Sequence, residues 1–137
     1  MLRMFPFTLF PLIIANLVIF GTPGTDPWGG HLMTLPLFSG ARWGLTVGDL
    51  MVVFGLAMLF VEILRAASIH AQVISNHMAS VIVLLIYVIE FVAVPGAAHS
   101  VFFILTVIAA IDVIAGVAVS IRMARRDFTY AGPGTTN

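Results

Sequence analysis

The sequence contains no cysteine and no lysine, and few charged residues of either sign. The absence of cysteine excludes disulfides, thiolate metal sites, iron–sulfur ligation and covalent haem attachment. Six arginines balance six carboxylates, so the net charge is zero and there is no basic field of the kind that binds nucleic acid. Only 9% of the residues are charged, against roughly 25% in soluble domains, and 61% are hydrophobic. This composition indicates a chain whose main solvent is not water.

Four apolar segments are each about long enough to cross a bilayer, whose hydrocarbon core requires roughly 20 helical residues. The first segment follows Arg3 and is similar to a signal peptide, but no small-x-small cleavage site follows it, so we interpret it as a membrane span. The predicted fold class is an all-α membrane protein, a single four-helix transmembrane domain over residues 1–137. We expect its spans at residues 4–20, 47–64, 77–94 and 101–121, and an outer loop at 21–45.

Local sequence signals mark several helix boundaries. Thr46 and Asp49 have the spacing of a capping box, in which each side chain accepts an amide proton at the start of a helix. Ser100 is a candidate cap for the fourth span, and Pro95 with the glycine after it is expected to end the third. The tail at residues 128–137 is predicted to be mobile.

The arginines are unevenly distributed over the ends of the spans. In a chain that crosses the membrane four times, five of the six arginines lie on one side and only Arg42 lies on the other. The positive-inside rule then places both termini in the cytoplasm and the loop at 21–45 outside. This loop contains Trp28, Trp43 and several large apolar residues. We therefore expect it to lie along the membrane surface or against a partner.

Two of the four carboxylates in the predicted spans lie near the outer surface. Charged groups inside a bilayer are costly and suggest a function, so the depth of each one matters. Asp49 already has its capping role. Glu90 lies near the outer end of the third span, where it would reach water or Arg42. Asn16, in the middle of the first span, is expected to form a hydrogen bond with a neighbouring helix.

The other two carboxylates, Glu62 and Asp112, lie at similar depths in the inner half of the membrane. Arg65 follows Glu62 by three residues on the same helix face, and it would be shared with Asp112 if the second and fourth helices touch. We interpret Glu62, Arg65 and Asp112 as a polar cluster that fixes which helices pack together. The alternatives are a proton or ion path and a contact with a partner protein.

Small residues mark the faces on which these two helices are expected to meet. On the second span Gly48, Gly55 and Glu62 recur every seven residues, and therefore share one face. Small side chains permit close approach of two helix backbones, so we expect this face to pack against the fourth span. The matching face of the fourth span carries Ala109, Asp112, Gly116 and Ser120.

The four histidines give little indication of a metal or cofactor. His70 and His77 would share a face of a continuous helix, but zinc ligands usually come in closer pairs, and we expect no metal site. His31 in the outer loop and His99 near the start of the fourth span could meet, and histidine ligates haem iron or a chlorophyll magnesium. We expect no cofactor, and keep a tetrapyrrole contact through His31 and His99 as an alternative.

Several stretches of the chain resemble an uncharacterised family of small four-span proteobacterial inner-membrane proteins. The resemblance touches most of the sequence and implies a multi-pass protein of the bacterial inner membrane. It implies no activity, because the family has none assigned. The stretches are Gly40-Ala41-Arg42-Trp43 with Gly48-Asp49-Leu50, Phe60-Val61-Glu62-Ile63, Ile89-Glu90-Phe91, and Asp112-Val113-Ile114-Ala115-Gly116 through Ala124-Arg125-Arg126-Asp127.

No catalytic signature is present: the sequence has no nucleophile elbow, H-E-x-x-H, P-loop or dinucleotide fingerprint. We expect a non-enzymatic accessory or scaffolding subunit of a larger respiratory or photosynthetic membrane complex, because the chain is almost entirely membrane and has few polar residues with which to line a pore. Its partners would be the bilayer, other integral membrane proteins and further copies of itself. The expected partner contacts are Trp28, Trp43, Arg122, Arg125 and Arg126.

Two other functions remain open at this point. The first is a homo-oligomeric proton or ion conductor that uses the carboxylates Glu62, Asp112 and Glu90. The second is a haem- or pigment-contacting membrane protein that uses the two histidines named above.

Overall fold

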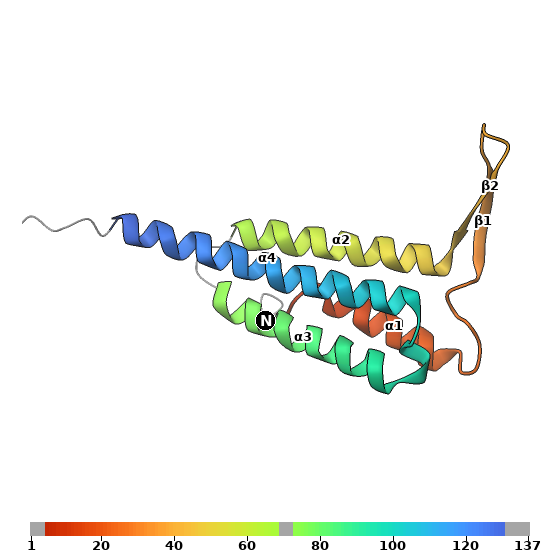
Figure 1. The fold of residues 1–137 in the computed structure, drawn as a ribbon, viewed down its shortest axis with the longest axis horizontal. Coiled ribbons are helices and arrows are strands. Elements are labelled where there is room, and N and C mark those ends of the chain that lie inside the picture. Colours follow the sequence, from red (N-terminus) through yellow and green to blue (C-terminus); the bar gives the residue numbers. More distant parts are fainter. Residues whose placement is uncertain (1–4, 69–72, 131–137) are drawn as a thin grey trace, which may run out of the picture.

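The computed structural model describes residues 5–68 and 73–130, with side chains described at 5–66 and 78–122. Within these residues the chain forms four helices, one two-stranded antiparallel sheet and one short 3-10 helix (Figure 1). The fold is mostly helical, as predicted, but it is not all-α. The elements are α1 (Leu9–Gly21), β1 (His31–Pro36), β2 (Arg42–Thr46), α2 (Val47–Ser68), α3 (Val73–Ala93), η2 (Pro95–Ala97) and α4 (Ser100–Tyr130).

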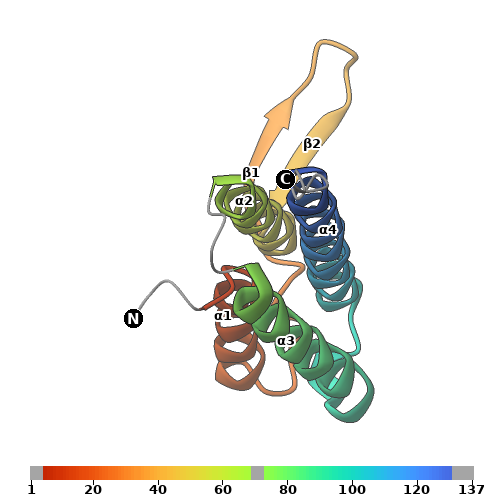
Figure 2. The same ribbon diagram turned by 90° about the vertical axis from the view of Figure 1, so that its left-hand side faces the viewer.

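The four helices run side by side, and consecutive helices run in opposite directions (Figure 1). α4 packs against both α2 and α3, and α1 contacts α2, α4 and η2. In the end-on view of Figure 2, a line drawn from α2 to α3 has α4 on one side and α1 on the other. The two strands project from one end of the helices, so the molecule has a hairpin end and an opposite end.

Among the residues that the structure describes, two helices are long and apolar enough to cross a membrane. They are the Val47–Ala66 part of α2 and the Ser100–Arg122 part of α4, with mean hydropathies of 2.2 and 2.6. The Leu9–Gly21 helix and the Met78–Ala93 part of α3 are apolar but shorter. α1 begins at Leu9 and not at residue 4, and its 13 residues measure about 20 Å, less than a bilayer core of about 30 Å.

Apolar side chains cover the outside of all four helices. Only 28% of the residues in the α2 window and 33% in the α4 window are buried. Each helix exposes large apolar side chains such as Leu17 (69%), Phe60 (62%), Ile89 (62%) and Ile114 (67%). Exposed apolar area costs about 25 cal/mol per Å² in water, and a patch of this extent marks a surface that another apolar phase or protein covers.

The loop predicted at 21–45 contains a β-hairpin, which the sequence-based prediction missed. β1 pairs with β2 from His31 opposite Thr46 to Pro36 opposite Arg42, with a bulge near His31. The turn is closed by a hydrogen bond from the Gly40 amide to the Leu37 carbonyl, and Gly40 has a φ of 82° that favours glycine. The strands carry a proline and only two β-branched residues, so the hairpin signal in a single sequence is weak.

Trp28 is buried and does not form the expected surface contact. Its exposed fraction is 2%, and its carbonyl accepts a hydrogen bond from the Gly48 amide at 3.0 Å. The Asp26 carboxylate accepts the Trp28 amide proton at 3.0 Å and thereby turns the chain back toward α2. Because Gly48 has no side chain, the Trp28 backbone can approach α2 closely; a Cβ at this position would lie 3.3 Å from the Trp28 carbonyl oxygen.

The predicted capping box is confirmed at the start of α2. The Asp49 amide donates to Thr46 Oγ1 at 3.1 Å, and the Thr46 amide donates to Asp49 Oδ2 at 2.9 Å. At α4 the cap is His99 and not Ser100, since His99 Nδ1 accepts the Val101 amide proton at 3.2 Å. α4 also continues past residue 121 to Tyr130, so its end includes the first residues of the predicted mobile tail, and 131–137 lie outside the described residues.

Candidate functional site: a polar junction between the helices

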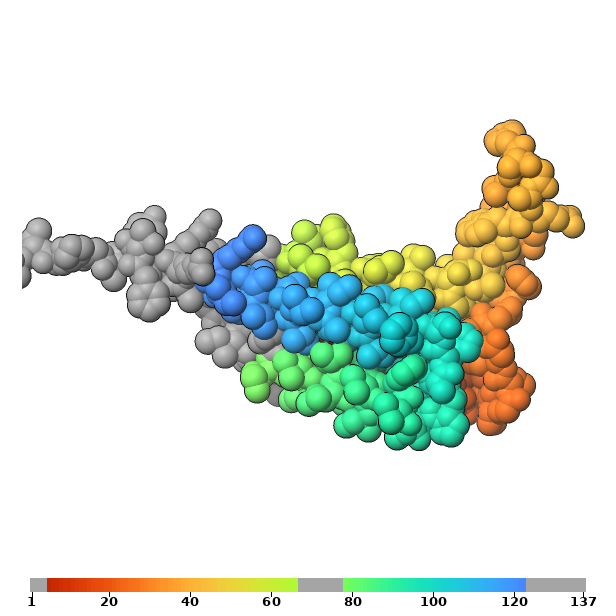
Figure 3. All heavy atoms as spheres, viewed as in Figure 1, coloured from red at the N-terminus to blue at the C-terminus, as the bar shows by residue number. Residues whose placement is uncertain are grey.

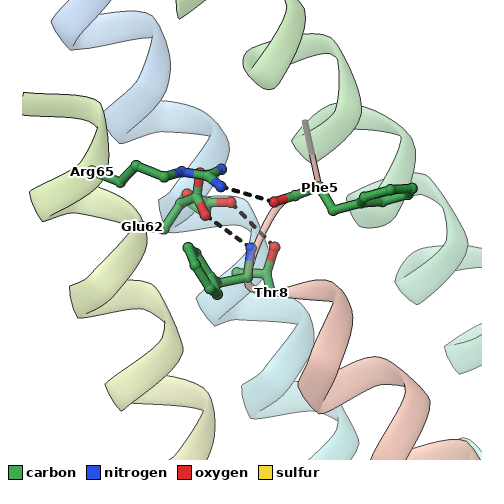
Figure 4. A network of polar contacts seen from close by, with 6 residues as sticks. Phe5, Thr8, Glu62 and Arg65 are labelled. Carbon is green, nitrogen blue, oxygen red and sulfur yellow. Dashed lines mark hydrogen bonds and ion pairs between the residues drawn. The ribbon is translucent and has the colours of Figure 1, made fainter. Parts of the chain in front are cut away.

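Buried polar side chains from four segments meet near the end of the helices that lies opposite the hairpin. Figure 4 shows the contacts among Phe5, Thr8, Glu62 and Arg65. Thr8 comes from the turn before α1, Glu62 and Arg65 from α2, Ser80 from α3 and Asp112 from α4. We call these five residues the polar junction. Thr8, Glu62, Ser80 and Asp112 have exposed fractions of 2% to 5%.

Glu62 connects α2 to the segment that precedes α1. Its Oε2 accepts the Phe7 amide proton at 2.8 Å, and its Oε1 accepts a hydrogen bond from Arg65 Nη2 one helical turn away. Arg65 Nη1 in turn donates to the Phe5 carbonyl at 3.0 Å. The Arg65 guanidinium also lies over the Phe7 ring, 4.8 Å from its centroid, where the face of the ring attracts a cation.

Asp112 connects α4 to the same segment and to α3. Thr8 Oγ1 donates to Asp112 Oδ2 at 3.2 Å, and the Ser80 hydroxyl is a second hydrogen-bond partner of this carboxylate. Tyr87 extends the network on α3, since its hydroxyl donates to the Thr8 carbonyl at 3.3 Å. In a buried and weakly solvated position, a hydrogen bond of this kind stabilises the packing of the helices that supply its two partners.

The structure brings Glu62, Arg65 and Asp112 into one cluster, in which the positive charge of Arg65 acts on the Asp112 carboxylate as well as on Glu62. Arg65 also donates to the Phe5 carbonyl. A second link, which the sequence did not indicate, is the chain segment Phe7–Thr8, which joins Glu62 to Asp112. The Phe7 amide lies just before α1, where a backbone N–H has no intrahelical partner, and it is therefore available to a side chain.

Three members of this network were not predicted from the sequence: Thr8, Ser80 and Tyr87. Thr8 lies between two prolines, inside the span predicted at residues 4–20. Ser80 and Tyr87 carried a usable signal, since they are seven residues apart and so share a face of an apolar helix. A tyrosine hydroxyl and a serine on one face of an apolar helix both require partners, and together they indicate the face of α3 that packs inward.

A second polar contact joins α1 to α3 away from the polar junction. Asn16 Nδ2 donates to Glu90 Oε2 at 2.7 Å and to the Leu12 carbonyl at 3.0 Å. The expectation that Asn16 bonds to a neighbouring helix is confirmed. Glu90 therefore reaches α1 and not Arg42, which lies in β2 opposite Pro36.

We predict that Asn16 and Glu90 are energetically coupled. Asn16→Ala and Glu90→Ala should each lower the free energy of unfolding in detergent, with a coupling energy of about 1 kcal/mol in the double variant. Unfolding by increasing mole fractions of sodium dodecyl sulfate, followed by circular dichroism, measures all three variants. Asn16→Ala combined with Asp49→Ala is the control, which should be additive because Asp49 bonds only within its capping box. An additive Asn16–Glu90 pair would contradict the assigned contact.

The glycine face of α2 packs against α4, as expected. A Cβ at Gly48 would lie 2.8 Å from Val101 Cγ2, and a Cβ at Gly55 would lie 2.7 Å from Leu105 Cδ2. The facing residues on α4 are large and apolar, so the glycines of α2 leave room for the large side chains of α4. The α4 residues that meet these glycines are therefore not the small ones that were expected. Within α4, Ser120 Oγ donates to the Gly116 carbonyl at 2.9 Å.

The two histidines considered for a tetrapyrrole have other neighbours. His99 caps α4 with Nδ1, its Nε2 lies 3.7 Å from Asp26 Oδ1, and its ring lies against Trp28. His31 lies in β1, with its ring beside Gly44 of β2. Among the described side chains, no three histidine or carboxylate groups converge on a point where a metal would sit.

The remaining predicted site residues divide between exposed and undescribed positions. Trp43 is 47% exposed on the hairpin, and Arg122 is exposed on α4. Arg125 and Arg126 belong to α4 by their backbone, but their side chains lie outside the described set, as does that of His77. His70 lies outside the described residues altogether.

The chain was compared with protein-family models, with curated proteins and with solved structures, and no match was found in any of the three. The resemblance to a four-span inner-membrane family therefore stays a prediction. Any functional assignment has to come from the site and the surface of this chain.

Proposed function

We propose that this chain is a non-catalytic integral membrane protein that serves as an accessory or scaffolding subunit of a larger membrane complex. The observation that carries the proposal is the distribution of polar and apolar side chains. The apolar ones cover the outside of every helix, while the carboxylates Glu62 and Asp112 are buried and Asn16 bonds to Glu90 between two helices. Water would penalise this distribution, whereas a bilayer favours it.

In this proposal all four helices cross the membrane. α3 has 21 residues and measures about 31 Å, which matches a bilayer core. α1 is shorter than the core, and a helix of this length is accommodated by local thinning of the bilayer or by packing against longer helices. The hydrogen bonds of Asn16, Thr8 and the Phe7 amide supply that packing.

The proposed orientation places the hairpin outside and both termini in the cytoplasm. Arg65 ends the apolar part of α2, and Arg122 ends that of α4. Both helices begin at the hairpin end (Figure 1), so both arginines belong to the opposite end. The positive-inside rule assigns that end to the cytoplasmic side of a bacterial inner membrane.

An accessory role fits the way in which the polar groups are used. Glu62, Arg65 and Asp112 hold the chain segments of this protein together and leave the outer faces of the helices apolar. Such faces bind lipid and other membrane helices. The partner class that we propose is a respiratory or photosynthetic complex, which would be contacted through the apolar helix faces and the arginines at the cytoplasmic end.

Native gel electrophoresis tests this function. Native membranes are solubilised in a mild detergent, and each band that contains the chain is identified by mass spectrometry and by its visible spectrum. We expect comigration with one large membrane complex, and weaker comigration for Arg122→Glu than for the outer-loop control Arg42→Glu. Migration only as copies of itself, for the wild type, would contradict the accessory role. A haem or pigment spectrum that stays with the isolated chain would favour the tetrapyrrole alternative.

A second function, proton or ion conduction by a homo-oligomer, is favoured by one specific observation. Two carboxylates, Glu62 and Asp112, are each only 5% exposed and are joined by the two-residue segment Phe7–Thr8. Carboxylates at this depth are found in proton relays. The protein reconstituted in vesicles should then conduct protons, and Glu62→Gln with Asp112→Asn should abolish the flux. Absence of flux in the wild type, or flux that survives both substitutions, would exclude this role for the two carboxylates.

A further inference from the structure

From Met33 to Pro36 the β-hairpin has one apolar face and one face of mixed polarity, and Leu32 lies at the bulge that precedes these pairs. Side chains alternate along each strand, and the register places Met33 opposite Leu45 and Leu35 opposite Trp43 on one face. The other face carries Thr34 opposite Gly44 and Pro36 opposite Arg42, and the His31 ring lies beside Gly44 on this same face. The apolar face is open: Met33, Leu35 and Trp43 have exposed fractions of 41% to 47%.

The hairpin extends sideways from the end of the helices. Figure 1 shows it rising past α2, transverse to the direction in which the helices run, and the space-filling view in Figure 3 shows it as a separate projection. Figure 2 looks along the helices from the end opposite the hairpin, and in it the two strands are seen side by side with one face of the sheet toward the viewer. One face of the two-stranded sheet is therefore directed to the side on which the helices lie.

The chirality of the amino acids, together with the direction of β1, identifies that face as the apolar one. The Leu37 amide donates to the Ala41 carbonyl, so Leu37 lies in a hydrogen-bonded pair, and Leu35 and Met33 follow at intervals of two residues. In Figure 2, β1 ascends to the left of β2. When an upward strand of L-amino acids lies to the left of its antiparallel partner, the side chains of its hydrogen-bonded pairs point toward the viewer. In Figure 2 the viewer is on the side of the helices, so Met33, Leu35 and Leu37 are directed to that side.

We propose that the apolar face of this hairpin lies on the headgroup region of the outer membrane leaflet, as a lateral anchor beside α2. This inference rests on the proposed function, since it takes the helices to cross the bilayer. β2 ends at Thr46 and α2 begins at the next residue, so the connection fixes the height of the hairpin at the outer end of α2. The surface that a transverse projection meets at that height is the bilayer interface.

The physical properties of the hairpin fit this location and no deeper one. A single two-stranded hairpin is at best marginally stable in water, so it needs a surface to pack against. Its two open edges exclude it from the hydrocarbon core, where backbone groups find no partners, while the headgroup region provides both water and polar acceptors. Aromatic side chains favour this region, and the hairpin offers Trp43 together with Phe38 at its tip. In this arrangement Trp43 contacts lipid and is not a contact for a partner protein.

Single-cysteine variants test the anchor, and the absence of natural cysteines means that no residue must first be removed. Leu35→Cys and Thr34→Cys place a fluorescent label on opposite faces of the same strand, and Leu56→Cys places one on the exposed side of α2. Each labelled protein is reconstituted in vesicles of phosphatidylethanolamine and phosphatidylglycerol. Quenching is then measured with a lipid that carries a nitroxide near its headgroup, with a lipid that carries one deep in its acyl chain, and with iodide in the water.

We expect the label at Leu35 to lose fluorescence with the headgroup nitroxide and to resist iodide, and the label at Thr34 to show the reverse. The label at Leu56 should respond to the deep nitroxide alone. If Leu56 responds in this way but Leu35 and Thr34 are equally open to iodide, the anchor is wrong and the membrane-spanning proposal stands. If Leu35 resists both iodide and the nitroxide lipids, a protein surface covers the face, and the lipid assignment is overturned. If Leu56 is quenched by iodide, the membrane-spanning proposal itself fails.

Discussion

Replacing Glu62 with alanine is expected to lower the free energy of unfolding by roughly 3 kcal/mol, the cost of removing one member of a buried ion pair. The substitution takes away the carboxylate that accepts both the Phe7 amide and the Arg65 guanidinium. It thereby detaches α2 from the segment that leads into α1. Unfolding in mixed micelles with increasing sodium dodecyl sulfate, followed by circular dichroism, gives the change in stability.

Two further variants separate the charge of Glu62 from its hydrogen bonds. Glu62→Gln keeps an acceptor for the Phe7 amide and should lose less stability than Glu62→Ala. Arg65→Ala combined with Glu62→Ala should lose less than the sum of the two single losses, because the two side chains act as a pair. A loss below about 0.5 kcal/mol for Glu62→Ala, the range of an ordinary surface substitution, would contradict the assignment of the polar junction as the link between the helices.

Gly55→Leu should lower the free energy of unfolding by roughly 2 kcal/mol, because it overpacks a tight contact between two helices. A single Cβ at this position would lie 2.7 Å from Leu105 Cδ2 and 3.2 Å from Ile108 Cδ1. The Leu105 and Ile108 side chains are almost fully buried and have little room to move. α2 and α4 would therefore have to separate, and the two carboxylates of the polar junction would move apart with them.

Two glycine substitutions serve as controls for this result. Gly55→Ala should cost less than Gly55→Leu, because a methyl group needs only a small shift of the Leu105 side chain. Gly21→Leu should leave stability nearly unchanged, since a Cβ at Gly21 meets no atom within 4 Å. The same unfolding assay compares all three variants. Equal stability of Gly55→Leu and the wild type would show that α2 and α4 do not pack closely in the membrane.

Features that depend on a single helix were accessible from the sequence. The capping box of Thr46 and Asp49, the pairing of Glu62 with Arg65 and the glycine face of α2 all follow from spacings of three to seven residues, and helix geometry fixes what such spacings place together. The structure contains each of these three features.

Features that depend on segments far apart in the chain were not accessible in the same way. The Thr8–Asp112 hydrogen bond joins residues separated by 104 positions, and no local pattern of either residue identifies the other. Trp28 was expected at the membrane surface because indole rings favour the headgroup region. It is buried because Asp26 and the Gly48 amide together fold the loop back onto α2, which requires knowledge of both contacts.

The most direct test of the membrane-embedded arrangement is the reaction of single cysteines along the outer face of α2 with a water-soluble maleimide. The positions are Leu50, Val53, Leu56, Phe60 and Leu64, whose side chains have similar exposed fractions, between 48% and 62%. In water, five thiols of similar exposure would react at similar rates. In intact membrane vesicles we predict that cysteines at Val53, Leu56 and Phe60 stay unlabelled. They should react once a denaturing detergent has dissolved the membrane and unfolded the protein. Comparable labelling of all five positions in intact vesicles would contradict the account.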